Sequence, residues 1–164
     1  MSISPDHLLA HVIKPTLTYL ADETGLNLDS ENAAMLLLGT QAHESLGGYW
    51  LSQAPTGPAR GIYQMEVKTH DWLWSDYLDR RHDLANAAMK MVPRGQNVAE
   101  RMVTDLSYAT AMCRIYYWAV PEPIPGDLKG WASYWKRHWN TAAGAGTEAK
   151  FIEDWNRWAK SAIS

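Results

Sequence analysis

The sequence has very little cysteine, since Cys113 is the only one among its 164 residues. A single thiol excludes an internal disulfide framework and leaves no cysteine cluster for a metal. Cys113 falls within the apolar pattern of residues 98–117, which favours a buried small hydrophobic residue over a nucleophile. The histidines are scattered and lack the spacing of a zinc site, so we expect no metal and no other cofactor.

An excess of charge of one sign is also absent, because 15 Lys and Arg residues are interspersed with 18 Asp and Glu residues. The net charge of -3 lacks the basic footprint of a nucleic-acid-binding protein, so no nucleic-acid partner is expected. No apolar run is long enough to span a bilayer, and the N-terminal residues lack the pattern of a secretory signal. We therefore expect neither a membrane partner nor a signal peptide.

Repeats, low-complexity tracts and linkers are absent, and the chain is long enough to bury a sizeable core. We expect a single domain over residues 1–164 with a mainly α fold. Caps, prolines, glycines and apolar periodicity predict where the helices begin and end. The expected helices cover residues 4–25 with an interruption near Pro15, 30–46, 69–82, 98–119, 128–140 and 147–161, with a break at 93–95 and a rigid connector at 121–126.

The helix expected at 30–46 carries a carboxylate at its polar end. Ser30 can cap this helix, residues 33–38 are apolar on more than one side, and a pair of glycines stops it. The helix dipole disfavours a carboxylate near a C-terminus, so the position of Glu44 needs a reason. A carboxyl group held against apolar neighbours keeps its proton near neutral pH, which suits a general acid. Glu44 is therefore the candidate acid, and the alternative is an ordinary solvated residue; the adjacent His43 is expected to pack or to hydrogen bond.

A second segment with the character of a site follows a run of turn-forming residues. Residues 62–65 are expected to form a short strand or an irregular edge. In alternating geometry Ile62 and Gln64 face one side, and Tyr63 and Met65 face the other. Gln64 can then point into a cleft, where its amide would bind sugar hydroxyl or acetamido groups; the alternative is a surface hairpin without a ligand.

Tryptophan is abundant, with nine residues in the chain. Trp131, Trp135 and Trp139 recur every four residues along one face of an expected helix. Such an aromatic stripe is usually part of the core, and Trp139 is the candidate exception that could stack on a sugar ring. The polar residues 136–138 are expected on the solvated face of the same helix.

Three short segments, taken in their order along the chain, resemble the lysozyme-like superfamily, particularly the soluble lytic transglycosylases and goose-type lysozymes. The segments are Glu44-Ser45, Gly61-Ile62-Tyr63-Gln64 and Trp139-Asn140-Thr141-Ala142-Ala143-Gly144. The resemblance implies a lysozyme-like helical fold with a small β-hairpin or irregular segment near the active-site cleft. It implies that Glu44 is the catalytic acid/base, with Ser45 as its orienting neighbour, and that Tyr63, Gln64 and Asn140 bind substrate.

The sequence departs from the family pattern in two places. The third segment has an extra residue before its glycine. The ninth position after Glu44, where some phage lysozymes carry an Asp, is Gln53. A mechanism of that phage-lysozyme type is therefore not expected.

Glu66 is the candidate second carboxylate, since many glycosidases use two. It could instead cap the next helix or pair with Lys68 or Arg60. The resemblance to transglycosylases, which work with one glutamate, favours single-acid chemistry by Glu44.

The resemblance predicts cleavage of the β-1,4 MurNAc-GlcNAc bond of bacterial peptidoglycan by a phage-type lytic transglycosylase or muramidase. Its expected partners are peptidoglycan glycan strands and other virion proteins. Its expected location is the phage virion or the host cytoplasm, with delivery to the wall in the periplasm by another component. Two alternatives stay open, namely a virion structural or assembly protein with little catalysis and a chitinase-like glycosidase.

Overall fold

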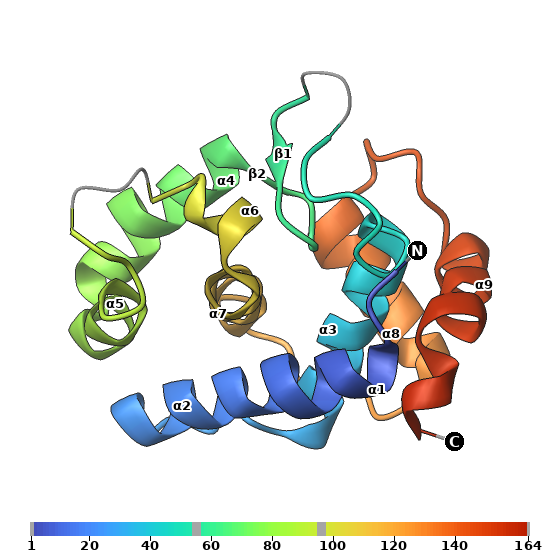
Figure 1. Ribbon diagram of the computed structural model, residues 1–164, viewed down its shortest axis with the longest axis horizontal. Coiled ribbons are helices and arrows are strands. Elements are labelled where there is room, and N and C mark those ends of the chain that lie inside the picture. Colours follow the sequence, from blue (N-terminus) through green and yellow to red (C-terminus); the bar gives the residue numbers. More distant parts are fainter. Residues whose placement is uncertain (1, 54–56, 95–97, 164) are drawn as a thin grey trace.

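The computed structural model describes residues 2–53, 57–94 and 98–163, and its fold is mainly α with a small two-stranded hairpin (Figure 1). The expected fold class is confirmed in these terms. Among the described residues, no helix combines the length and the apolar character that crossing a membrane requires.

The first part of the chain forms α1 Pro5–Leu8, α2 Lys14–Thr24, α3 Glu31–Glu44, β1 Ala59–Arg60, β2 Met65–Glu66 and α4 Val67–Trp72. The second part forms α5 His82–Met89, α6 Arg101–Thr104, α7 Leu106–Trp118, α8 Leu128–Trp135 and α9 Glu148–Trp158. Short π-helical or 3-10 segments extend these helices at Leu9–Ile13, Leu73–Tyr77, Leu78–Arg80, Lys136–Asn140 and Lys160–Ile163.

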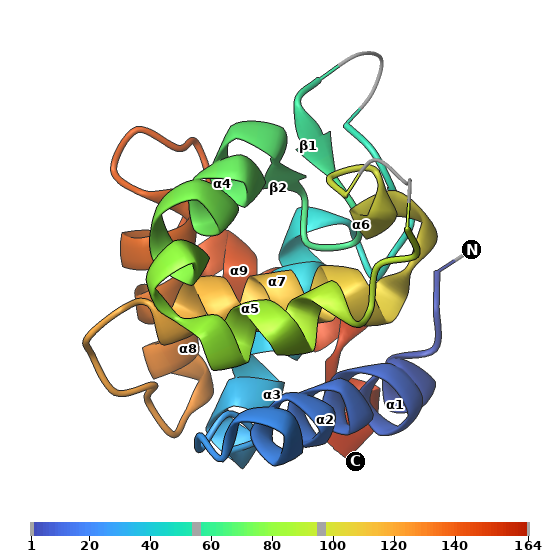
Figure 2. The same ribbon diagram turned by 90° about the vertical axis from the view of Figure 1, so that its left-hand side faces the viewer.

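The helices pack around α3 and α7. Helix α3 contacts α7, α8 and α9, while α2 contacts both α5 and α7. Figure 2 shows α5 and α7 running side by side above α2, and the hairpin of β1 and β2 at the far edge of the fold from α2. Buried hydrophobic residues of these helices form one continuous cluster.

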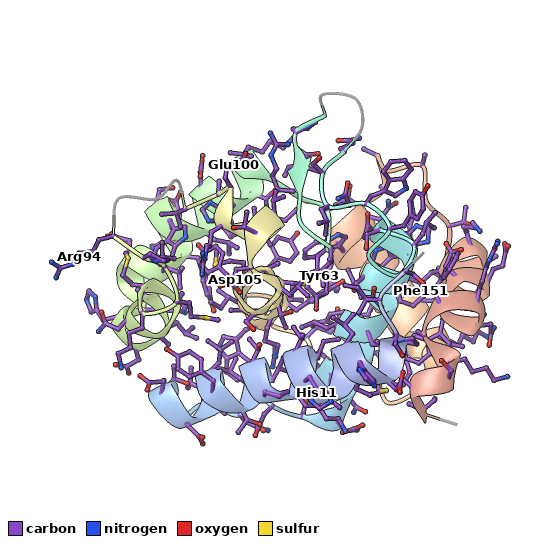
Figure 3. The ribbon with its side chains drawn as sticks, in the orientation of Figure 1. His11, Tyr63, Arg94, Glu100, Asp105 and Phe151 are labelled. Carbon is purple, nitrogen blue, oxygen red and sulfur yellow. The ribbon has the colours of Figure 1, made fainter. Side chains whose placement is uncertain are left out.

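Helix α3 is buried along most of its length, and its residues 33–38 are apolar on more than one side. Ser30 caps it by accepting a hydrogen bond of 3.2 Å from the backbone nitrogen of Ala33, as predicted. At Gly39 an added Cβ would lie 2.5 Å from Cζ of Phe151, so the absence of a side chain lets α9 approach closely (Figure 3). The helix ends at Glu44, slightly before the expected end, because Leu46 already has a positive φ of 53°.

The interruption near Pro15 is confirmed. Pro15 lacks a backbone N–H for the helical ladder, and the π-helical segment Leu9–Ile13 lies immediately before it. Helix α2 ends at Gly25, as expected, where φ is 71°.

The prediction of one long helix over 98–119 is wrong. Asp105 has extended backbone angles (φ −134°, ψ 107°) and separates α6 from α7 (Figure 3). Its carboxylate accepts hydrogen bonds from the backbone nitrogens of Ser107 and Tyr108, at 2.9 and 3.0 Å. An aspartate that caps a helix interrupts an apolar pattern that otherwise continues through it.

Two further boundaries differ from the expectations. The helix expected at 69–82 begins at Val67 and its 3-10 extension ends at Arg80, and α5, which was not expected, follows. The break expected at 93–95 ends on residues outside the described ranges. The irregular connector at 121–126 and the two helices that follow it are confirmed.

Of the two alternatives for residues 62–65, a short strand or an irregular edge, the structure shows the irregular one, with only Met65 in a strand. Residues 61–64 form the turn of the hairpin, in which Ala59 pairs with Glu66 and Arg60 pairs with Met65. Gly61 has a φ of 74°, and a Cβ there would lie 2.4 Å from the carbonyl oxygen of Met102. Only glycine therefore allows this turn to lie against α6.

Candidate active site

Glu44 occupies the last position of α3, where the buried helix reaches a pocket. The indole nitrogen Nε1 of Trp135 in α8 donates a hydrogen bond of 2.9 Å to Glu44 Oε1. Burial raises the pKa of the Glu44 carboxyl to about 7, and the hydrogen bond from Trp135 opposes part of that rise. The group is therefore about half protonated at neutral pH, which is the condition that a general acid requires.

The side chains that α7 places beside Glu44 are buried. Cys113 and Tyr117 are buried there, and the Tyr117 hydroxyl lies 2.9 Å from Thr40 Oγ1. Burial, and after it the nearby charge of Glu44, raise the pKa of the Cys113 thiol well above its ordinary value. The prediction that Cys113 is a buried hydrophobic residue is confirmed, and the thiol is kept in its unreactive form.

The surface around Glu44 is hollowed into two adjoining pockets. Glu44, Gln64 and Glu66 line both of them. One pocket, of about 370 Å³, continues to Tyr116, Trp139, Asn140 and the backbone as far as Gly144, and the other, of about 470 Å³, continues to Trp50 and Gln53. We call the two pockets together the groove. Glu44 thus lies at the middle of a groove with space on both sides.

Gln64 reaches the groove from the hairpin turn. Its φ is 50°, and its side-chain nitrogen Nε2 donates a hydrogen bond of 2.8 Å to the carbonyl oxygen of Gly61. The turn therefore fixes the direction of the amide, and the prediction that Gln64 faces a cleft is confirmed although the residue is in a turn and not in a strand.

Asn140 lies across the groove, at the end of the π-helical segment Lys136–Asn140. Lys136 Nζ donates to Asn140 Oδ1 at 2.7 Å and to the carbonyl oxygen of Gly144 at 2.9 Å. The ammonium group therefore orients the amide and closes the loop 140–144, which accommodates the extra residue of this segment. Lys136 is partly exposed and Arg137 is exposed, as expected for a solvated face; Arg137 and His138 bond to Glu122.

Ser45 and Tyr63 do not line the groove. The Ser45 hydroxyl donates to the carbonyl oxygen of Gln41 and accepts from the backbone nitrogen of Gly48, both at 3.0 Å. Tyr63 is 1 % exposed, and its hydroxyl lies 3.0 Å from Thr110 Oγ1 in the interior of the fold (Figure 3). Ser45 thus holds the backbone that follows Glu44. The expected contact of Tyr63 with substrate is corrected: its side chain lies in the interior and holds the turn that carries Gln64.

Glu66 lines the groove but is paired. Its Oε2 lies 2.7 Å from Nζ of Lys68, while Arg60 pairs with Glu100 at 2.7 Å. It precedes α4 without a side-chain capping bond. Of the alternatives open for Glu66, the ion pair with Lys68 is therefore the one observed.

Sequence reasoning missed the contact between Trp135 and Glu44, since it assigned Trp135 to the core. Trp135 is indeed buried, and its ring packs edge-on against His43 with centroids 4.4 Å apart. The available signal was the four-residue spacing to Trp139, which puts both rings on the face that meets the groove.

His43 packs against Trp135 and is itself held by a hydrogen bond. Its Nδ1 lies 2.8 Å from Oδ2 of the buried Asp154, which also accepts a hydrogen bond from Lys150. Burial lowers the pKa of His43, and the bond to Asp154 opposes that effect. The prediction that His43 packs and hydrogen bonds is confirmed, whereas nothing in the sequence pointed to Asp154.

Within the ranges that the structure describes, no group of three or more His, Cys, Asp and Glu residues could hold a metal ion. Comparisons of the chain with protein-family profiles, curated proteins and solved structures find no match.

Proposed function

We propose that this protein cleaves the β-1,4 MurNAc-GlcNAc bond of bacterial peptidoglycan, with Glu44 as the proton donor. The observation that carries the proposal is the Glu44 carboxyl, bonded to Trp135 between the two pockets of the groove, where burial raises its pKa to about 7. A protonated carboxyl there can give its proton to the leaving glycosidic oxygen, and the buried side chains of α7 strengthen its interaction with the developing charge.

A single glutamate serves both steps in this proposal. After the bond breaks, the Glu44 carboxylate takes a proton back, either from a water molecule or from a hydroxyl of the sugar itself. Water gives a reducing MurNAc end, and the internal hydroxyl gives an anhydro end. The pairing of Glu66 with Lys68 leaves it as an electrostatic neighbour of the reaction, which favours the single-acid scheme.

The groove offers the contacts that an amino-sugar polymer needs. Gln64 presents an oriented amide from the hairpin turn and Asn140 presents one from the end of the π-helical segment, and these can bind hydroxyl and acetamido groups. Trp139 lies in the wall beside Asn140, with its ring edge-on to Tyr116 at 5.0 Å between centroids. Trp50, 43 % exposed, offers an indole face in the other pocket. The resemblance of the three motifs supports a phage-type muralytic role, in which another component delivers the protein to the wall.

The test is digestion of purified peptidoglycan sacculi, followed by mass spectrometry of the released muropeptides. Wild-type protein should release anhydro or reducing-end products, and Glu44→Gln should release almost none. Glu31→Gln is the matched control, because Glu31 lies on the same helix, is exposed and pairs with Lys14. The activity of this variant should match that of the wild type. Chitin oligomers are incubated in parallel, and their cleavage in place of peptidoglycan would favour the chitinase-like alternative.

Two results would contradict the proposal. One is equal release by wild type and Glu44→Gln. The other is no release by wild type from any of several wall types, which would favour an assembly role with little catalysis.

A further inference from the structure

A further pocket, of about 330 Å³ and separate from the groove, opens at the end of α3 opposite Glu44. The 14 residues of α3 separate the two ends by about 20 Å. Polar residues and apolar residues of the α7 end and the following connector both line the pocket. The polar set is Asn27, Ser30, Asn32, Arg114 and Glu122, and the apolar and aromatic set is Tyr117, Trp118, Val120, Pro123 and Ile124.

Arg114 is the distinctive member of this lining. It is 2 % exposed, and its Nε donates a hydrogen bond of 2.7 Å to the carbonyl oxygen of Leu28. Its Nη1 is buried without a hydrogen-bond partner, and among the described residues no carboxylate forms an ion pair with it. Burial lowers the pKa of Arg114 to about 10, so the guanidinium stays charged at neutral pH. A buried charge without an ion-pair partner has a high desolvation cost, and an anion in the pocket would offset that cost.

The N-terminus of α3 adds to the positive potential. Ser30 caps the helix through the backbone nitrogen of Ala33, and the first turn directs its remaining N–H groups toward the same end. The carboxylates near the pocket are exposed or have other cations as partners. Glu122 lines the pocket and bonds to Arg137 and His138, and Glu31 pairs with Lys14. Asp29 is exposed, and its charge opposes part of the lowering of the Arg114 pKa.

The apolar residues of the pocket favour a ligand with an apolar part. The Arg114 guanidinium lies 5.1 Å from the centre of the Trp118 ring, so the cation and the indole face lie next to each other. Pro123 and Ile124 continue the apolar wall. The volume is at the lower end of the range for small-molecule sites.

We propose that this pocket binds a small organic acid, with its carboxylate at Arg114 and its apolar body against Trp118 and Ile124. A guanidinium suits a carboxylate because its planar fork matches the two oxygens. The site is independent of the groove and of the chemistry proposed for Glu44.

The test is a titration of ¹⁵N-labelled full-length protein with benzoate, followed by NMR of the backbone amides and the Arg114 side chain. Saturable shifts should appear at Arg114, at Trp118 and in the first turn of α3 at millimolar benzoate. An absence of shifts at these residues would overturn the proposal.

Asn32→Asp tests the charge requirement without disturbing the fold. An aspartate in the first turn of α3 is favourable for the helix, yet it adds a negative charge to the pocket. Benzoate affinity should fall at least about fivefold, because like charges repel at short range. Asn86→Asp, the same change at an exposed position of α5, should leave the affinity unchanged.

Equal affinities for Asn32→Asp and wild type would overturn the proposed position of the carboxylate. Inorganic phosphate that binds as well as benzoate at the same residues would overturn the role of the apolar wall.

Discussion

The indole N–H of Trp135 donates a hydrogen bond to Glu44 Oε1, with 2.9 Å between nitrogen and oxygen, and this bond joins α8 to the end of α3. The bond favours the charged carboxylate, while burial disfavours it and prevails. The acid strength of Glu44 is thus set by two opposing effects, one of which can be removed alone.

Trp135→Phe removes the bond and leaves most of the packing. The pKa of Glu44 should then rise further above its value of about 7, because the charged form loses its donor. The alkaline limb of the pH–activity profile should move upward by on the order of one pH unit, since the bond favours only the charged form. Trp131→Phe is the control on the same helix, because the Trp131 nitrogen donates to Pro125. A limb that moves equally in both variants, or downward in Trp135→Phe, would contradict this explanation.

The raised pKa of Glu44 also makes the stability of the fold depend on pH. A carboxyl whose pKa is about 7 in the folded protein, against an ordinary 4.5, binds its proton more tightly when folded. Its contribution to the free energy of unfolding is therefore complete below pH 4.5 and declines as the pH rises through 7. The decline should amount to about 3 kcal/mol.

Glu44→Gln lacks this titration. Urea unfolding at a series of pH values should show wild type losing stability relative to Glu44→Gln between pH 4.5 and pH 7. A difference between the two proteins that stays constant across this range would show that Glu44 titrates normally.

Glu66→Gln tests whether one carboxylate is sufficient. Because Glu66 pairs with Lys68 at the side of the groove, its loss should lower kcat less than about tenfold. Initial rates on labelled sacculi provide the measurement, with Glu44→Gln as the reference for complete loss. A loss as large as that of Glu44→Gln would establish a second catalytic carboxylate.

Tyr63→Phe tests the corrected role of Tyr63. The variant loses the hydrogen bond to Thr110 in the interior, so its free energy of unfolding should fall by about 1 kcal/mol. Its KM should match wild type, because the side chain does not line the groove. Tyr49→Phe, at an exposed position, should change neither quantity. A raised KM with unchanged stability would restore Tyr63 as a substrate-binding residue.

Local signals in the sequence were sufficient where one residue decides the structure. Ser30 caps α3, Pro15 interrupts the first helical segment, and Gly25 ends it. Glu44 could be recognised because it combines an apolar helix, an unfavourable dipole and a glycine stop. The break at Asp105 was missed because the apolar pattern continues through it and only the capping geometry reveals it.

Contacts between distant segments could not be predicted. The partners Trp135 and Asp154 lie 91 and 111 residues from Glu44 and His43, respectively, and no periodicity within one helix encodes such pairings. Tyr63 was expected in the cleft because the family resemblance implied it, whereas the structure buries its side chain in the interior. The location of Glu44 was therefore predictable, but its chemical environment was not.

The most direct measurement is an NMR titration of the Glu44 side-chain carboxyl carbon in wild-type protein, which needs no knowledge of the substrate. The account predicts a midpoint at about pH 7, with the group protonated through the mildly acidic range. A midpoint near the ordinary value of 4.5 would leave Glu44 ionised at neutral pH and would contradict its role as the proton donor.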